Sequence, residues 1–172
     1  MQMLLLHYYD GMVHATLIAR VQLYARGRWF DGEDSKNPDS PALPLVFCGD
    51  FNFRPVSFQY ACMTSGKHAL NPSSPHLKEH KSSFVSGWKA PDLEPMKSLY
   101  AAVHGAEPRY TNNCIQLFGR SENPFCDTLD YVFGNARVRA MSAVLLPAAG
   151  PHMPNQHQPS DHLPVVVEVD IS

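Results

Sequence analysis

Short apolar runs separated by polar, turn-forming segments make up most of the chain. A short apolar or alternating run bounded by Gly, Pro, Asn or Asp is typical of a strand in a sheet. The strands predicted in this way cover residues 3–9, 45–48, 109–113, 128–133, 138–146 and 163–171.

Apolar positions at helical spacing occur between the predicted strands. Leu17 and Val21 share one face of the longest such segment, and Pro55 followed by Ser57 can begin a second helix. The polar segments at 31–44 and 67–95 lack any sustained period and are expected to form loops. The sequence therefore predicts a mixed α/β domain without internal repeats. The helices predicted cover residues 11–28, 57–63 and 96–104.

Composition narrows the class of protein. The 172 residues carry 14 basic and 16 acidic side chains, a net charge of −2, so no overall basic surface is available to hold duplex nucleic acid. No apolar stretch approaches the roughly 18 residues of a membrane span, and no signal peptide is recognisable, so we expect a cytoplasmic protein without membrane contact. The four cysteines lack zinc-site or paired spacing and are interpreted as packing residues.

The predicted strand at 45–48 is followed by an acid and an amide two residues apart, Asp50 and Asn52. Strand alternation would place both on one face. A carboxylate there can take a proton from water while an amide donates to a phosphate oxygen, as phosphodiester hydrolysis requires. An Asx turn that caps the strand is the simpler alternative. With Gly49 and Pro55 at fixed offsets, the chance of a random match falls to the order of 10⁻³ at about 5% per residue type.

A second group of polar residues precedes the last predicted strand. Asp161 and His162 lie in this loop, and Asp130 interrupts the apolar strand at 128–133. Burying an unpaired Asp is costly, so we expect Asp130 to pair with His162 and to orient its imidazole. A carboxylate that caps a neighbouring backbone amide is the alternative for Asp130.

These segments together resemble the endonuclease/exonuclease/phosphatase superfamily of DNase I-like enzymes. Residues 49–52 with Pro55 match its GD-x-N-x-x-P segment, residues 129–133 resemble its LDY-(I/V)-F strand, and residues 160–162 are similar to its terminal SDH. The order and spacing agree as well.

Within that superfamily the chain is most similar to the deadenylase branch, which includes nocturnin, the Angel proteins and the 2′,5′-phosphodiesterase. His7 matches a histidine at a strand end in that branch, and Tyr110-Thr111-Asn112 matches its YTN segment. The resemblance extends from Leu4 to Ile171.

The resemblance implies a role for each matched residue. Asp50 would deprotonate the attacking water, Asn52 and His7 would donate to the phosphate, and His162, oriented by Asp130, would stabilise charge in the transition state. The resemblance implies Mg²⁺ (or Mn²⁺) as cofactor, held by Asp161 and Asp50. Phe125 matches an aromatic platform for a nucleobase, with core packing as the alternative.

The resemblance also implies a four-layered α/β sandwich of the DNase I type, of which residues 1–172 form the C-terminal part. The N-terminal portion of such a domain, with the Glu that is the principal Mg²⁺ ligand, has no counterpart here. We therefore expect the chain alone to be inactive. We also expect it to expose sheet surface, including residues 165–167, to a protein partner or to a second copy.

The function that follows is Mg²⁺-dependent hydrolysis of single-stranded RNA, by a 3′-to-5′ exoribonuclease or a poly(A) deadenylase. Two alternatives remain at this point. One is a phosphohydrolase of small molecules from the same superfamily, and the other is a catalytically inactive interaction module.

Overall fold

A computed structural model describes residues 43–66, 94–118 and 121–171 of the chain. The predicted strand at 3–9, with His7, and the predicted helix at 11–28 lie outside these residues, as does most of the polar segment at 67–95. The predicted roles of His7 therefore stay predictions.

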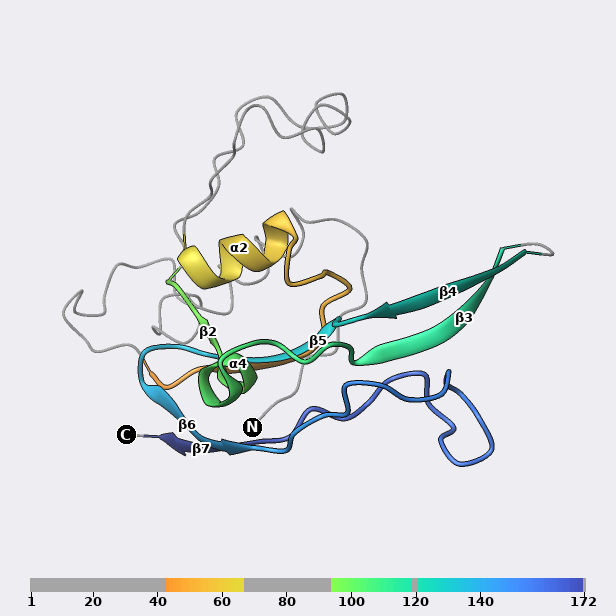
Figure 1. Ribbon diagram of the computed structural model, residues 1–172. Helices are drawn as coiled ribbons and strands as arrows, with labels where there is room; N and C mark the ends of the chain where they lie inside the picture. Colours follow the sequence, from red (N-terminus) through yellow and green to blue (C-terminus); the bar gives the residue numbers. More distant parts are fainter. Residues whose placement is uncertain (1–42, 67–93, 119–120, 172) are drawn as a thin grey trace, which may run out of the picture.

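The described residues form strands and helices in mixed order, as an α/β chain should (Figure 1). The elements are β1 (Val46–Asp50), α2 (Phe58–Ser65), β2 (Lys97–Ser98), α4 (Leu99–His104), β3 (Asn112–Phe118), β4 (Ser121–Asp127), β5 (Asp130–Gly134), β6 (Val138–Ala143) and β7 (Val167–Ile171).

Strand β5 is the centre of the described sheet structure. It pairs antiparallel with β1 on one side and with the short β2 on the other. Two further antiparallel pairs accompany this sheet, β3 with β4 and β6 with β7. The far end of the β3–β4 pair projects away from the central sheet (Figure 1), whereas the start of β3 is bonded to the loop between β6 and β7. The base of the β3–β4 pair lies next to the start of β5, because Thr111 N–H donates to the carbonyl oxygen of Asp127 at 3.1 Å.

Both described helices are bounded by residues that suit helix ends. Ser57 caps α2, since its hydroxyl accepts a hydrogen bond from Tyr60 N–H at 3.2 Å, and Ser98 caps α4 in the same way through Ala101 N–H. Helix α4 packs against β5 and β6, whereas α2 packs against β2. In Figure 1, α4 lies between the central sheet and the β6–β7 pair, and α2 lies on the other side of the sheet.

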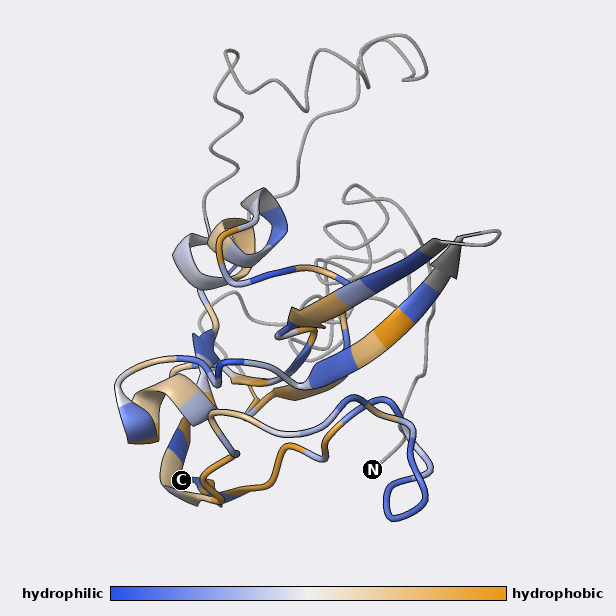
Figure 2. Cartoon of the chain, turned by 45° about the vertical axis from the view of Figure 1, so that its right-hand side comes forward, coloured by the Kyte–Doolittle hydropathy of each residue, from blue (hydrophilic) through white to orange (hydrophobic). Residues whose placement is uncertain are grey.

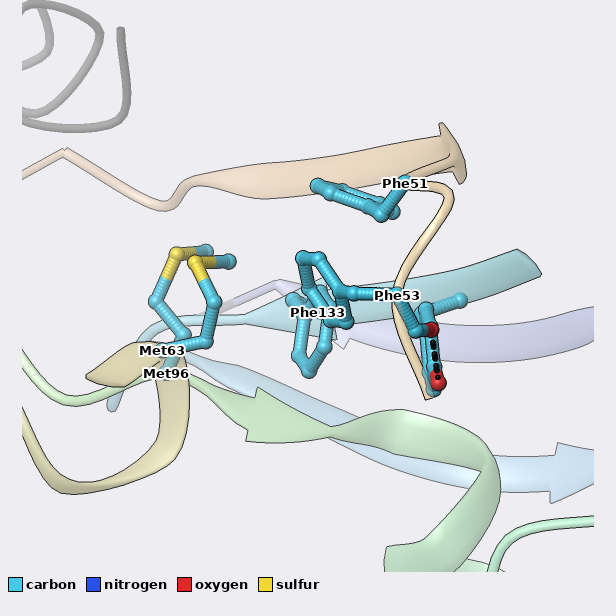
Figure 3. Packing of buried hydrophobic residues seen from close by; sticks show 6 residues of the cluster. Phe51, Phe53, Met63, Met96 and Phe133 are labelled. Carbon is cyan, nitrogen blue, oxygen red and sulfur yellow. Dashed lines mark hydrogen bonds between the residues drawn. The ribbon is translucent and has the colours of Figure 1, made fainter. Parts of the chain in front are cut away.

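The hydrophobic core lies between α2 and the central sheet. Phe51 and Phe53 follow β1, and their rings contact the ring of Tyr131 from β5 at centroid distances of 6.0 and 5.3 Å. Met63 of α2 lies beside this aromatic group (Figure 3). The core thus fixes the chain on both sides of Asn52. The buried members of the cluster are Phe51, Phe53, Met63, Met96, Tyr131 and Phe133.

Several predicted elements differ from the observed ones, and the strand predicted at 138–146 ends at Ala143. The strand predicted at 109–113 begins only at Asn112 and continues to Phe118, and its partner β4 was not predicted. The helix predicted at 96–104 begins at Leu99, because residues 97–98 pair with β5 instead. The last strand begins at Val167 rather than at Leu163.

The interpretation of all four cysteines as packing residues is wrong for two of them. Cys62 and Cys114 are buried, but Cys48 and Cys126 are exposed. Each exposed cysteine lies in a strand at a position that faces solvent.

Apolar side chains are exposed around the β6–β7 pair. Within residues 165–167, where we expected exposed sheet, only Val166 is exposed, and it lies before β7. Val166 is 51% exposed, and Met141 and Ile171 are similarly open. The loop that joins β6 to β7 is hydrophilic over residues 151–162 (Figure 2). None of the helices in the described residues is long and apolar enough to cross a membrane.

Candidate active site

Asp130 and His162 form a direct pair. Asp130 is the first residue of β5, and its Oδ2 lies 2.7 Å from Nδ1 of His162. Both side chains are mostly buried, with exposed fractions of 19% and 26%. The same Oδ2 accepts a hydrogen bond from the hydroxyl of Thr111 at 2.6 Å. The predicted pairing is confirmed, and the alternative of a carboxylate that only caps the backbone is excluded.

The loop that carries His162 is attached along the start of β3. Leu163 N–H donates to the carbonyl oxygen of Thr111 at 2.7 Å, and Asn113 N–H donates to that of Asp161 at 3.3 Å. Within the loop, Ser160 Oγ accepts from His162 N–H at 3.1 Å and forms a tight turn. Residues 111–113 thus lie between two segments, the end of β4 on one side and the loop that carries His162 on the other. This attachment holds His162 next to Asp130.

Opposing influences act on the pKa of His162. Burial of the imidazole lowers it, but the hydrogen bond to Asp130 and the negative charges of Asp130, Asp50 and Asp161 together raise it above the usual histidine value. The imidazole therefore carries a positive charge at a higher pH than a free histidine would. Such a group can donate a hydrogen bond to an anion and stabilise negative charge.

Asp50 and Asn52 form an Asx turn at the end of β1. Asn52 N–H donates to Asp50 Oδ1 at 2.8 Å, and Asn52 has a φ of 52°, in the left-handed region. Strand alternation does not extend to Asn52, because β1 ends at Asp50, so that part of the prediction is wrong. Gly49 has a φ of 149°, which only glycine adopts readily, immediately before the turn.

The turn places Asp50 at the start of β5 and leaves the Asn52 side chain exposed two residues later. Asn52 is exposed between the buried Phe51 and Phe53, so its amide faces outward while the neighbouring rings anchor the backbone. The β1–β5 register pairs Asp50 with Asp130. The Asx turn therefore does not exclude a catalytic role for Asp50, because the same conformation caps β1 and places Asp50 opposite Asp130.

Asn112 holds the remaining acid of the group. Its Nδ2 donates to Asp161 Oδ2 at 3.2 Å, and its Oδ1 is buried without a hydrogen-bond partner. Because buried polar atoms are rarely unpaired, such an oxygen beside a carboxylate suits a site that also binds a cation or its water.

The donor chemistry fits a hard divalent cation. Mg²⁺ prefers oxygen ligands, and in phosphate-processing sites it uses one or two carboxylates. Asp161 and Asp50 offer carboxylates at this edge of the sheet, and both act electrostatically on His162. Across residues 43–66, 94–118 and 121–171, no three side chains of the His, Cys, Asp or Glu type are grouped closely enough to hold a metal ion by themselves.

Phe125 lies on β4 and is partly buried, outside the core cluster. The guanidinium of Arg54 is 5.4 Å from the centre of its ring, and Arg54 Nε forms an ion pair with Asp127 Oδ2 at 3.0 Å. The contact with Arg54 shows that Phe125 is not simply a core residue.

The structure brings four predicted site residues together at the start of β5 and the end of β1, namely Asp50, Asp130, Asp161 and His162. Asn52 follows Asp50 in the same turn. Sequence reasoning missed the functional contacts of Thr111, Asn112, Arg54 and Asp127. Thr111 and Asn112 belong to the segment that resembles the YTN motif, and two adjacent polar residues next to a predicted strand already signal hydrogen bonding. Arg54 and Asp127 gave no local signal, because their pairing depends on the tertiary fold.

Comparison with known proteins decides the family. The model of the Endonuclease/Exonuclease/phosphatase family matches residues 8–162 of the chain. The chain belongs to this family. The predicted superfamily is confirmed on a match that includes Asp50, Asn52, Asp130 and His162.

Individual members of the Endonuclease/Exonuclease/phosphatase family are similar over most of the chain. Carbon catabolite repressor protein 4 homolog 4 of Arabidopsis thaliana is 31% identical over 134 residues, which are 74% of this chain and 27% of that protein. Nocturnin of Xenopus laevis is 30% identical, with 73% and 27% covered. The CCR4-Not complex 3′-5′-exoribonuclease subunit Ccr4 of Aspergillus terreus is 28% identical, and the match covers 81% of this chain and 21% of that protein. These relatives confirm the predicted deadenylase branch.

A solved structure confirms the fold class. The crystal structure of ANGEL2, described as a 2′,3′-cyclic phosphatase in complex with adenosine-2′,3′-vanadate, matches 92% of this chain and 52% of that one, with a TM-score of 0.57 and 22% identity. This likeness shows the DNase I-like α/β fold. The chain spans about a quarter of the length of the curated relatives it matches.

Proposed function

We propose that this member of the family hydrolyses phosphodiester bonds in single-stranded RNA from the 3′ end, with poly(A) as its preferred substrate. The observation that carries the proposal is the Asp130–His162 pair, 2.7 Å apart, at the same edge of the sheet as Asp50 and Asn52. Similarity to the Ccr4 subunit of Aspergillus terreus, a 3′-5′-exoribonuclease, supports the choice of reaction.

Each side chain has a task that its surroundings suit. Asp50 accepts the proton of the attacking water, and the exposed amide of Asn52 donates to the phosphate. His162 carries a raised pKa and donates from Nε2 to the phosphate, where negative charge grows in the transition state. Phe125 stacks on a nucleobase through the ring face that Arg54 does not cover.

Asp161 and Asp50 are the residues that would hold Mg²⁺ or Mn²⁺. The bound ion supplies Lewis-acid polarisation of the phosphate. Asn112 contributes by orienting Asp161 through its amide group. The remaining matched residue, His7, is proposed as a second phosphate donor on the resemblance alone.

The test is an assay of the longest natural form of the protein that contains these residues. Its substrates are 5′-labelled oligo(A), a labelled RNA duplex and adenosine 2′,3′-cyclic phosphate, each with Mg²⁺ or Mn²⁺. Stepwise shortening of oligo(A) from the 3′ end, abolished by Asp50→Ala, is the expected result. The Asp50→Ala protein also controls for a contaminating nuclease.

The cyclic phosphate serves as the substrate for a second candidate function, a small-molecule phosphohydrolase. The similarity of the fold to that of ANGEL2, a 2′,3′-cyclic phosphatase, favours this substrate as the second candidate. Turnover of the cyclic phosphate without cleavage of RNA would replace the exoribonuclease proposal by this one. A folded protein that acts on none of the three substrates would overturn both and favour an interaction module.

A further inference from the structure

Thr111 lies immediately before β3, fully buried, with its hydroxyl at the start of β5. Three groups surround this one oxygen. Leu129 N–H donates to it at 2.9 Å, Asp130 N–H donates to it at 3.0 Å, and Asp130 Oδ2 lies 2.6 Å away.

The hydroxyl of Thr111 can meet these three groups in one way only. A hydroxyl has one proton to donate and two lone pairs that accept. The two backbone N–H groups occupy both lone pairs, so the proton must point to Asp130 Oδ2. The atom at that position of residue 130 is therefore required to be an acceptor.

This requirement extends to His162. Its Nδ1 lies 2.7 Å from the same Oδ2. Because that oxygen accepts and carries no proton, the hydrogen between the two residues belongs to Nδ1. The other ring nitrogen, Nε2, is then free to act on a substrate, as an acceptor when the imidazole is neutral and as a donor when it is charged.

We propose that Thr111 is a positioning residue that fixes the polarity of residue 130 and, through it, the tautomer of His162. The catalytic consequence rests on the proposed function, but the tautomer does not. The ionised carboxylate of Asp130 is an acceptor with or without Thr111. The role of Thr111 therefore shows where residue 130 can present either a donor or an acceptor, and a threonine that only supports the backbone of β5 would leave that choice undetermined.

An Asp130→Asn substitution separates these two possibilities. An amide can present either its oxygen or its NH₂ group to His162. If Thr111 sets the polarity, the amide oxygen must face the Thr111 hydroxyl, and His162 keeps its hydrogen on Nδ1. If Thr111 has no such role, the NH₂ group can face His162 and move the hydrogen to Nε2, as happens in serine proteases when the orienting Asp becomes Asn.

The experiment is nitrogen NMR of imidazole-labelled, metal-free chain at alkaline pH, where neutral histidine dominates. The ¹⁵N shifts report which ring nitrogen carries the hydrogen, and His162→Gln identifies the His162 signals among the nine histidines. We expect the Nδ1–H form in the wild type and in Asp130→Asn. We expect the Nε2–H form in the double variant Thr111→Val with Asp130→Asn, and return of the Nδ1–H form with Thr111→Ser in place of Thr111→Val.

Two results would overturn the proposal. One is the Nε2–H form in Asp130→Asn alone, which shows that Thr111 does not set the polarity. The other is the Nδ1–H form in a folded double variant, which shows that something else does. Neither result depends on RNA hydrolysis, so failure of this inference and failure of the proposed function are distinguishable.

A kinetic measurement covers the case in which Thr111→Val prevents folding. In the active protein, Asp130→Asn should lower kcat by no more than about 10²-fold with little change in KM, because only the charge is lost. A loss near the roughly 10⁴-fold that a wrong tautomer causes in serine proteases contradicts the proposal.

Discussion

Asp50 and Asp130 lie directly opposite one another in the antiparallel pairing of β1 with β5. Like charges at opposed positions of a sheet destabilise it. Each carboxylate is partly compensated by separate donors, the Asn52 N–H for Asp50 and the Thr111 and His162 groups for Asp130. The same opposition increases the negative potential that favours the charged form of His162. The pair is therefore better suited to chemistry than to stability.

Substituting Asp50 should separate its contribution to catalysis from its cost to stability. Asp50→Asn keeps an oxygen that can accept from Asn52 N–H but removes the base and one of the opposed charges. We expect kcat to fall by at least about 10²-fold while the melting temperature stays equal or rises slightly. Asp170→Asn, in the exposed Arg139–Asp170 pair on β6 and β7, is the matched control. Activity of Asp50→Asn within threefold of the parent would remove Asp50 from the role of base.

Two substitutions separate the left-handed backbone conformation of Asn52 from the hydrogen bonding of its side-chain amide. Asn52→Gly preserves the left-handed turn at φ 52° but removes the amide, whereas Asn52→Ala also strains the backbone. We expect both variants to lose activity and only Asn52→Ala to lose about 1–2 kcal/mol of unfolding free energy. Urea unfolding gives the stability. Full activity in Asn52→Gly would show that the turn, not the amide, is what the site needs.

Glu107 provides a prediction for pH. Its carboxylate accepts a hydrogen bond from the Tyr60 hydroxyl at 2.7 Å. Burial raises the pKa of Glu107, and the hydrogen bonds from Ser98 and Tyr60 only partly oppose this. Between the ordinary and the raised pKa, the folded chain holds a proton that the unfolded chain has lost. The free energy of unfolding therefore falls as pH rises through this window and then levels off.

Glu107→Gln lacks this titration, so its stability relative to the wild type should increase over the same pH range. Chemical denaturation at several pH values on both sides of the usual Glu pKa measures the difference. The exposed Glu122→Gln controls for the loss of one charge. A difference between Glu107→Gln and the wild type that is constant with pH would show that burial does not shift this group.

Gly134 is the site of a packing prediction. A Cβ added there would lie 2.9 Å from Leu99 Cδ2 and 3.0 Å from Val138 Cβ, closer than side chains normally approach. Gly134→Ala should therefore cost about 1–3 kcal/mol of unfolding free energy. The cost should be smaller in a Leu99→Ala background, because the Leu99 methyl groups are removed. Equal costs in the two backgrounds would place the strain at Val138 or in the backbone.

The sequence was informative where local chemistry decides structure. An acid in an apolar strand must find a partner, and this reasoning led correctly from Asp130 to His162. The capping serine Ser57 likewise predicted the start of α2. Family motifs then supplied the fold, which periodicity alone could not.

Other features depend on contacts that no local pattern records. Strand β4 contains Pro124 and several polar residues, so only its pairing with β3 makes it a strand. The left-handed conformation of Asn52 broke the alternation that we assumed. The Arg54–Asp127 pair joins the segment after β1 to the end of β4 and is visible only once both are placed.

The pairing of β1 with β5 has a consequence for folding. Leu45 N–H donates to Asn135 Oδ1 across 90 residues of chain. Contacts at such separations slow folding, because a long loop must close before any bond rewards it. During synthesis, Phe51 and Phe53 cannot be buried in this core until Tyr131 and Phe133 have been made. Until then the nascent chain exposes an unpaired apolar strand, so its yield in a cell should depend strongly on chaperones.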